Sequence, residues 1–153
     1  MYKKILVPLD GSELSEHALG HLKELLTSSD DTSVVLLQVV EPFTALYAGG
    51  PGATTVALDA QKRAEADASA YLDKLASRLK RKKLSIETAV ITGIPADVIL
   101  DYISQNNVDL VVMSTHGRSG MSRWFFGSVA EKVIRHTTVP VLVSPPQGTR
   151  ASR

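Results

Sequence analysis

The chain has 153 residues, of which 44% are hydrophobic, and its 17 basic and 16 acidic side chains leave a formal net charge of +1. This balance excludes the electrostatic footprint of bulk nucleic-acid or membrane-surface binding, so any anionic ligand must be held locally. The absence of cysteine excludes disulfides, thiolate zinc sites and a cysteine nucleophile. The length predicts one globular domain, residues 1–147, with a flexible tail at residues 148–153.

Nothing in the sequence indicates export or membrane insertion. The apolar run near the N-terminus is too short for a signal-peptide core, and no later run approaches the roughly 18 apolar residues of a membrane span. We therefore expect a soluble, cytoplasmic protein.

Five short runs rich in valine, isoleucine and leucine are near-continuous rather than alternating. This pattern is typical of strands that are covered on both faces in a parallel sheet. The runs are residues 5–9, 34–40, 88–91, 110–113 and 139–143.

Between these runs, apolar residues recur at the three- and four-residue spacing of amphipathic helices. Such helices are predicted over Leu14–Leu26 and Ala64–Leu79, with Ser12 as the N-cap of the first. A third begins near Pro95 and a fourth at Ser128. Strands that alternate with helices through right-handed crossovers predict a single-domain, doubly wound α/β fold. This is a Rossmann-like parallel sheet of five strands in the order 3-2-1-4-5, with helices on both faces.

Residues 41–57 fit this plan poorly, because the segment is rich in glycine, proline and threonine and is long for a connection in a compact domain. Two interpretations stay open: a disordered surface loop, or a lid over a ligand.

The most unusual residues follow the first and fourth strands. Doubly wound sheets bind ligands beyond the carboxyl ends of the strands, where the strand order reverses, and in the expected order this lies between those two strands. The first strand ends in PLDGS, residues 8–12, and the fourth in MSTHG, residues 113–117. Both segments are expected to face one crevice.

The segment after the fourth strand has the composition of an anion-binding loop. Gly117 would let the backbone approach a phosphate, and Gly127 would open the entrance of the last helix. The N–H groups near Ser128 and Val129 would then point at anionic oxygens, with the helix dipole behind them. Arg118 would neutralise charge, as His116 or Arg123 also would. Asp10 has the chemistry to accept hydrogen bonds from ribose hydroxyls.

Each of these features has a purely structural alternative. Ser128 followed by Glu131 forms a capping box, and Asp10 to Ser12 would serve as a turn and cap. His17 and His21 lie one helical turn apart, but they lack a third ligand at a matching position and are expected on a solvated helix face. The remaining candidates are a loop histidine and two aromatic residues that would pack the loop onto the core: His116, Trp124 and Phe125.

The glycines also follow a known spacing. Gly117, nine residues and Gly127-Ser128 resemble the glycine signature of the nucleotide-binding branch of the universal stress protein family. In that signature an earlier glycine stands three residues before the second, and here Ser114 takes its place. The opening KKILVPLDGS, the strand end at Val39-Val40, GSVAEKVIRH and the closing VPVLVSP also resemble that family, so the similarity covers almost the whole chain.

The resemblance implies an ATP-binding module that acts in a stress response. ADP, AMP or a cyclic nucleotide remain open as the ligand, and Mg²⁺ would be carried by the phosphates. The residues implied to line the adenine and ribose slot are Pro8, Leu9, Val39, Val40 and Met113. Ser114 would either crowd the ribose or donate a hydrogen bond to it, and we expect binding to survive. The resemblance also implies a homodimer through the edge strand Val139–Val143.

Other functions match the sequence less well. No triad, carboxylate pair or metal cluster is recognisable and the Walker A lysine is missing, so at most slow ATP hydrolysis is expected. A phospho-receiver domain would use Asp10 but needs an aspartate after the third strand, where this chain has ITGIP, residues 91–95. An adenylating enzyme or ATP pyrophosphatase would need a richer glycine loop than LDGSELS, residues 9–15. A family member that acts through protein partners alone is the remaining alternative.

Overall fold

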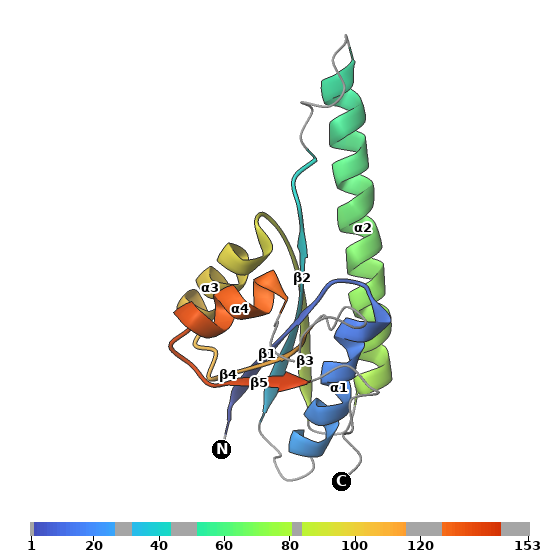
Figure 1. Ribbon diagram of the computed structural model, residues 1–153. Helices are drawn as coiled ribbons and strands as arrows, with labels where there is room; N and C mark the ends of the chain where they lie inside the picture. Colours follow the sequence, from blue (N-terminus) through green and yellow to red (C-terminus); the bar gives the residue numbers. More distant parts are fainter. Residues whose placement is uncertain (1, 27–31, 44–51, 81–83, 116–126, 145–153) are drawn as a thin grey trace, which may run out of the picture.

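The computed structural model describes residues 2–26, 32–43, 52–80, 84–115 and 127–144 (Figure 1). Strands and helices alternate along the chain. Their order is β1 (Lys4–Leu9), α1 (Glu13–Leu25), β2 (Ser33–Val40), α2 (Ala53–Leu79), β3 (Ser85–Thr92), α3 (Pro95–Gln105), β4 (Leu110–Ser114), α4 (Ser128–His136) and β5 (Val141–Ser144). The proposed tail at residues 148–153 lies outside the described residues.

The strands form one parallel sheet in the order β3-β2-β1-β4-β5, which confirms the predicted doubly wound topology. Two hydrophobic clusters cover its faces. One joins β1, β2 and β4 to α1 and α2, and it includes Val7 and Leu72. The other joins the opposite face of the same strands to α3 and α4, and it includes Leu6 and Val133. Because successive strand residues point to opposite faces, the apolar runs of the central strands supply both clusters.

Three of the four predicted helix starts are correct. Ser12 caps α1, its side chain accepting a hydrogen bond from the Ser15 N–H at 3.1 Å, and Pro95 is the first residue of α3. The fourth helix begins at Ser128, but its N-cap is Gly127, and none of the described side chains caps it. The capping-box alternative is therefore wrong: Glu131 instead pairs with Arg135 across one helical turn at 2.8 Å.

The start of α2 differs most from expectation. The helix begins at Ala53, eleven residues before Ala64, so the segment 41–57 is not one continuous loop. Its N-cap, Gly52, has a φ of +96°, which is the left-handed conformation that favours glycine. Proline and glycine before residue 53 concealed the start, although the alanine-rich sequence that follows has high helix propensity. The possible lid role of residues 44–51 falls outside the described residues.

The two edge strands are also shifted from their predicted bounds. β3 is longer than predicted and carries exposed side chains such as Glu87, because it is covered less than the central strands. β5 lies at the other edge, as expected, but begins at Val141. Pro140 therefore precedes the strand, and its carbonyl accepts a hydrogen bond from the Val111 N–H at 3.0 Å.

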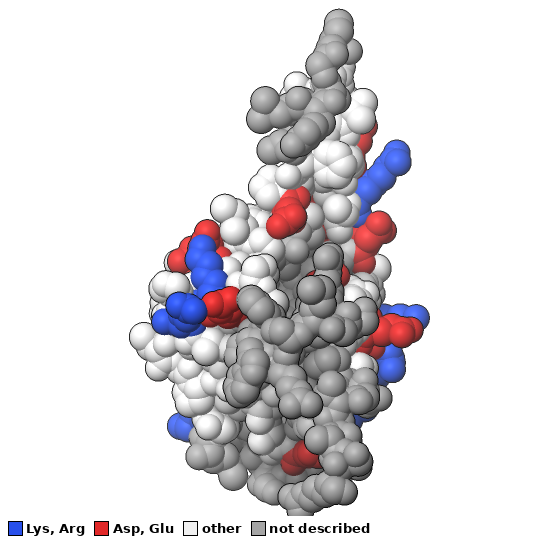
Figure 2. Space-filling view, in the orientation of Figure 1, with Lys and Arg blue, Asp and Glu red and all other residues white. Residues whose placement is uncertain are grey.

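The described surface carries both signs of charge. On the face shown in Figure 2, acidic and basic side chains occur close together. Ion pairs join Lys132 to Asp97 and Arg135 to Glu131. Within the described ranges, no helix has the length and apolarity needed to cross a bilayer.

Gly93 offers a test of the packing at the carboxyl end of the sheet. Its N–H donates to the Val40 carbonyl at 3.0 Å, and an added Cβ would lie 2.6 Å from Cγ2 of Val98. Because a valine side chain on a helix has little rotamer freedom, we expect Gly93→Ala to lower the free energy of unfolding by about 1–3 kcal/mol in urea titrations. Gly20→Ala is the control: nothing lies within 4 Å of that Cβ, and a gain of about 0.5–1 kcal/mol is expected. Equal effects of the two substitutions would contradict this view of the packing.

Candidate functional site

The candidate site lies at the carboxyl ends of β1 and β4, which are neighbours in the sheet. The chain leaves β1 toward β2 on one side of this point, whereas β4 leads to β5 on the other. Connections that run in opposite directions leave a crevice between them, and ligands of doubly wound proteins bind in this crevice. Asp10 and Ser114, the residues at the two strand ends, are thus placed next to the reversal of strand order.

The turn after β1 is held by its own hydrogen bonds. One carboxylate oxygen of Asp10 accepts from the Ser12 N–H at 2.9 Å and from the Ser12 hydroxyl at 2.5 Å. Gly11, between them, has a φ of +82°, which suits glycine alone. The turn-and-cap interpretation of this segment is therefore correct. It also leaves Asp10 exposed directly after β1.

Ser114 points toward α1. Its hydroxyl donates to the Ser15 carbonyl in the first turn of that helix, at a long 3.4 Å. The next residue, Thr115, is buried, and its N–H donates to the Ser144 carbonyl at 3.2 Å. The serine in the place of the first signature glycine thus links the end of β4 to the start of α1.

The five residues expected to line an adenine slot divide between the two faces of the sheet. Leu9 is buried in the cluster beneath α1 and α2. Met113 is buried in the cluster on the opposite face, and Val39 packs against that second cluster. Pro8 and Val40 are half-buried. All five lie at or next to the carboxyl ends of the three central strands, but Leu9 and Met113 serve mainly as core residues.

The entrance of α4 has no cap from the side chains that the structure describes. Gly127 has backbone angles of −55° and 151°, and Ser128 is exposed at the first helical position. Val129 is half-buried against the α3 and α4 cluster. A helix entrance without a side-chain cap presents N–H groups to whatever lies before it. The rest of the predicted loop, including His116, Gly117, Arg118, Arg123, Trp124 and Phe125, lies outside the described residues.

Two polar clusters beside the strand ends were missed by sequence reasoning. In the first, Glu65 of α2 accepts from the Thr92 hydroxyl at 2.7 Å and from the Gln61 amide at 3.0 Å. The hydrogen bond from Gln61, and to a smaller extent that from Thr92, holds the pKa of Glu65 below its usual value. Gln61 also donates to Thr92 at 3.0 Å and accepts from the Phe43 N–H at 2.9 Å. No sequence signal marks this cluster, because its members come from three separate segments.

The second cluster joins α1 to α2. The Tyr71 hydroxyl donates to a carboxylate oxygen of Glu16 at 3.1 Å, and the same carboxylate lies 3.7 Å from Arg78. Burial, followed by the hydrogen bond and negative charge of Glu16, raises the pKa of Tyr71 to about 12. The contact fixes the first turn of α1, which carries Ser15, against the long helix α2.

The described residues contain no group of three potential metal ligands. His21 faces Glu24, with 3.8 Å between Nδ1 and Oε2. His17 is half-buried, and its Nδ1 has no hydrogen-bond partner in the described structure.

The strand order places the chain among the doubly wound α/β proteins. The model of the universal stress protein family matches residues 1–145. The chain belongs to the universal stress protein family.

Two similar proteins come from Methanocaldococcus jannaschii. Universal stress protein MJ0531 is 35% identical over 149 residues, which are 94% of this chain and 82% of that protein. The solved structure of MJ0577 superposes with a TM-score of 0.82 at 28% identity and covers 97% of this chain and 99% of its own.

Two more distant structures show that the fold is shared with nucleotide complexes. A universal stress protein family protein from Arabidopsis thaliana, with AMP bound, has a TM-score of 0.68 at 18% identity and covers 95% of this chain and 93% of its own. A universal stress protein in complex with cAMP has a TM-score of 0.60 at 22% identity. This match covers 95% of this chain and 98% of that protein's chain. At these identities the likeness is one of fold.

Tyr71 gives a pH-dependent test of the α1–α2 contact. Because its pKa is raised from 10.0 to about 12, the phenol stabilises the fold fully below pH 10 and loses this contribution as the pH rises toward 12. Tyr71→Phe should lower the free energy of unfolding by about 1 kcal/mol at neutral pH. In urea titrations, the difference in this free energy between variant and wild type should shrink as the pH rises from 10 toward 12. Absorbance titration of the tyrosines should also lose its highest-pH component, and an unchanged titration curve would contradict the assignment.

Proposed function

We propose that the protein is an adenine-nucleotide-binding module of the stress response, with ATP as the principal ligand. The observation that carries this proposal is positional. The signature spacing from Gly117 to Gly127 ends at the uncapped entrance of α4, and Asp10 is exposed at the neighbouring strand end. A polyphosphate on the helix side and a ribose near the carboxylate would together span the crevice.

The described residues fit this ligand in chemistry. Ser128 is exposed at the helix entrance, so its hydroxyl would donate to a phosphate oxygen while the first-turn N–H groups do the same. Gly127 leaves the approach clear of a side chain. Pro8, Val39 and Val40 are half-buried and offer apolar surface to a base, whereas Leu9 and Met113 would support that surface from within the core. His116, Gly117 and Arg118 are proposed as the loop that covers the phosphates.

Binding rather than catalysis is the proposed activity, with at most slow hydrolysis. The AMP and cAMP complexes of the distant fold relatives support an adenine ligand and leave the number of phosphates open. A receiver-type function has less support. The strand order differs from that of the flavodoxin-like receivers, and β3 ends in Thr92, which already bonds Glu65. A family member that acts through partners without nucleotide is the competing proposal.

The sharpest test substitutes the helix entrance. The backbone angles of Gly127 are open to any residue, so Gly127→Val should fold normally while its side chain blocks the phosphate approach. Isothermal titration with ATP should show binding by the wild type and at least a tenfold weaker affinity for the variant, about 1.4 kcal/mol. Gly20→Ala, on the exposed side of α1, is the matched control and should bind as the wild type does.

Absence of binding by a well-folded wild type would overturn the proposal. Normal ATP binding by Gly127→Val would contradict the assignment of the segment from Gly117 to Gly127 to the phosphates. Denaturing protein purified from its host and identifying the released small molecule by mass spectrometry would name the nucleotide directly.

We also propose a homodimer through β5 and a cytoplasmic location. β5 lies at the edge of the described sheet, and an edge strand offers a surface with which a second copy would pair. Light scattering should give a dimer at micromolar concentration, and a monomer would contradict this pairing.

A further inference from the structure

The first half of α2 has no buried side chain. The helix has 27 residues, about 40 Å of length, and its buried residues Ala68, Leu72, Leu75 and Leu79 all lie in the second half. In Figure 1 the first half extends beyond the sheet. We call residues 53–67 the α2 overhang. An isolated helix of this length is marginal in water, so a partner would stabilise it.

Large apolar side chains are exposed at the same end of the molecule. In the described chain, four such side chains are more than half exposed: Phe43 at 62%, Val56 at 66%, Leu58 at 57% and Ile94 at 63%. Val56 and Leu58 belong to the α2 overhang, and the Phe43 N–H bonds Gln61 of the same helix at 2.9 Å. Exposed apolar groups gathered at one end indicate an interaction surface.

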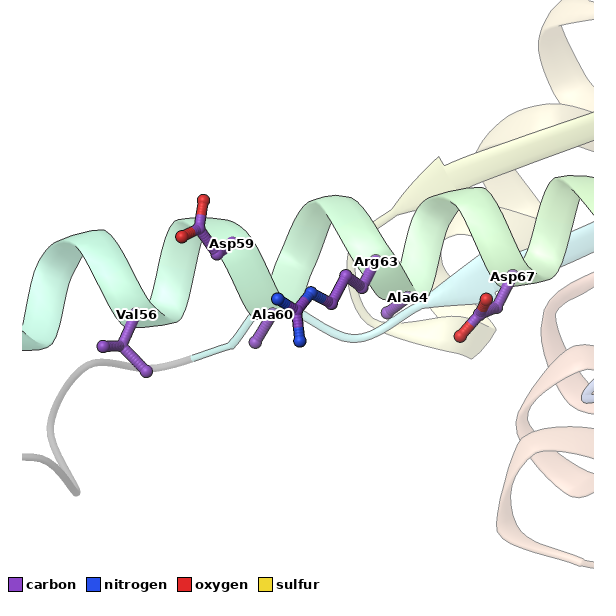
Figure 3. A pocket seen from close by; sticks show the side chains of 6 residues that line it. All are labelled: Val56, Asp59, Ala60, Arg63, Ala64 and Asp67. Atoms are coloured by element: carbon purple, nitrogen blue, oxygen red, sulfur yellow. The ribbon is translucent and has the colours of Figure 1, made fainter.

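One flank of the α2 overhang is hollowed. A surface hollow of about 470 Å³ is lined by Val56, Asp59, Ala60, Arg63, Ala64 and Asp67. Figure 3 shows Val56, Ala60, Arg63, Ala64 and Asp67 on one side of the helix, with the Asp59 carboxylate turned away from them. None of the residues expected around a nucleotide lines this hollow, so it is a separate surface.

The charged residues of the α2 overhang can pair with the same residues of a second copy. Asp59 and Asp67 lie four residues before and after Arg63, and Arg63 has no ion pair within the described part of the chain. When two identical helices pack antiparallel across a two-fold axis, each flank meets its own copy. An axis level with residue 61 then sets residue 59 of each copy level with residue 63 of the other, and a rotamer change of the exposed Asp59 side chain brings its carboxylate to Arg63 of the second copy.

We propose that the α2 overhang is a docking surface for a second copy of this chain, packed antiparallel in this register. Ala60 and Ala64 are small enough for the two helices to approach closely, and Val56 of one copy then lies within two residues of the level of Ala64 of the other. The axis falls near the middle of residues 53–67. The alternative register, with Arg63 opposite Asp67, moves the axis toward the buried half of the helix.

This surface is independent of the β5 edge. α2 packs on β2 and β3, at the opposite side of the sheet from β5. Both contacts can therefore form in one assembly.

Charge reversal tests the register in the full chain. Sedimentation velocity over a concentration series should show at least a tenfold weaker self-association for Arg63→Asp than for the wild type, because two acidic groups then face each other. The double variant Asp59→Arg/Arg63→Asp should restore the wild-type value. An equimolar mixture of the single variants Asp59→Arg and Arg63→Asp should associate better than either alone. Lys74→Asp, exposed on the second half of α2, is the control and should leave association unchanged.

Cross-linking tests proximity without changing a charge. The chain has no native cysteine, so Ala60→Cys with a short bis-maleimide should give a covalent dimer, whereas exposed Ser69→Cys, outside the hollow, should not. Equal association of Arg63→Asp and the wild type, no rescue by the double variant, or equal cross-linking at the two positions would each overturn the proposal. These measurements need no nucleotide, so their failure is distinct from failure of the nucleotide proposal.

Discussion

The parallel pairing of β1 with β4 is the contact on which the rest of the architecture depends. Ile5 pairs with Leu110 and Leu6 with Val111, which joins segments that are far apart in the sequence. At the amino ends, the Asp109 carboxylate accepts from the N–H groups of Lys3 and Lys4 at 2.8 and 3.1 Å. These bonds fix the register without a turn between the strands. Because the chain runs outward in opposite directions from this pair, the crevice at its carboxyl end follows from the topology itself.

The same pairing determines which side chains reach the crevice. Side chains at a strand end alternate between the two faces, so Leu9 packs under α1 and Met113 packs under α3 and α4. Polar groups are left to Asp10, which follows β1, and to Ser114, the last residue of β4. They are tied to α1 through Ser12 and Ser15, and α1 is in turn tied to α2 by the hydrogen bond between Glu16 and Tyr71. The strand ends at the candidate site are thus held by contacts with α1 and, through α1, with α2.

α2 illustrates how one helix serves two environments. Its second half is amphipathic and buries leucines against the sheet, whereas its first half is anchored mainly through polar contacts of Gln61 and Glu65 with the ends of β2 and β3. Such contacts orient a helix but bury little apolar surface, which is the dominant source of stability. The exposed valine, leucine and self-complementary charges of the α2 overhang therefore suit an intermolecular contact better than an intramolecular one.

The sequence by itself determined the fold class, the strand order, the family and three helix starts, because hydrophobic periodicity, caps and right-handed crossovers are local or topological rules. It also identified Gly127 and Ser128 at a helix entrance, but it could not tell which of the two caps the helix, because this depends on backbone angles. Only the tertiary structure decided that α2 begins at Ala53, that Ser114 bonds α1, and that Leu9 and Met113 lie in opposite core clusters. The clusters around Glu65 and Tyr71 likewise join residues distant in sequence, and no local pattern encodes such contacts until the sheet has brought them together.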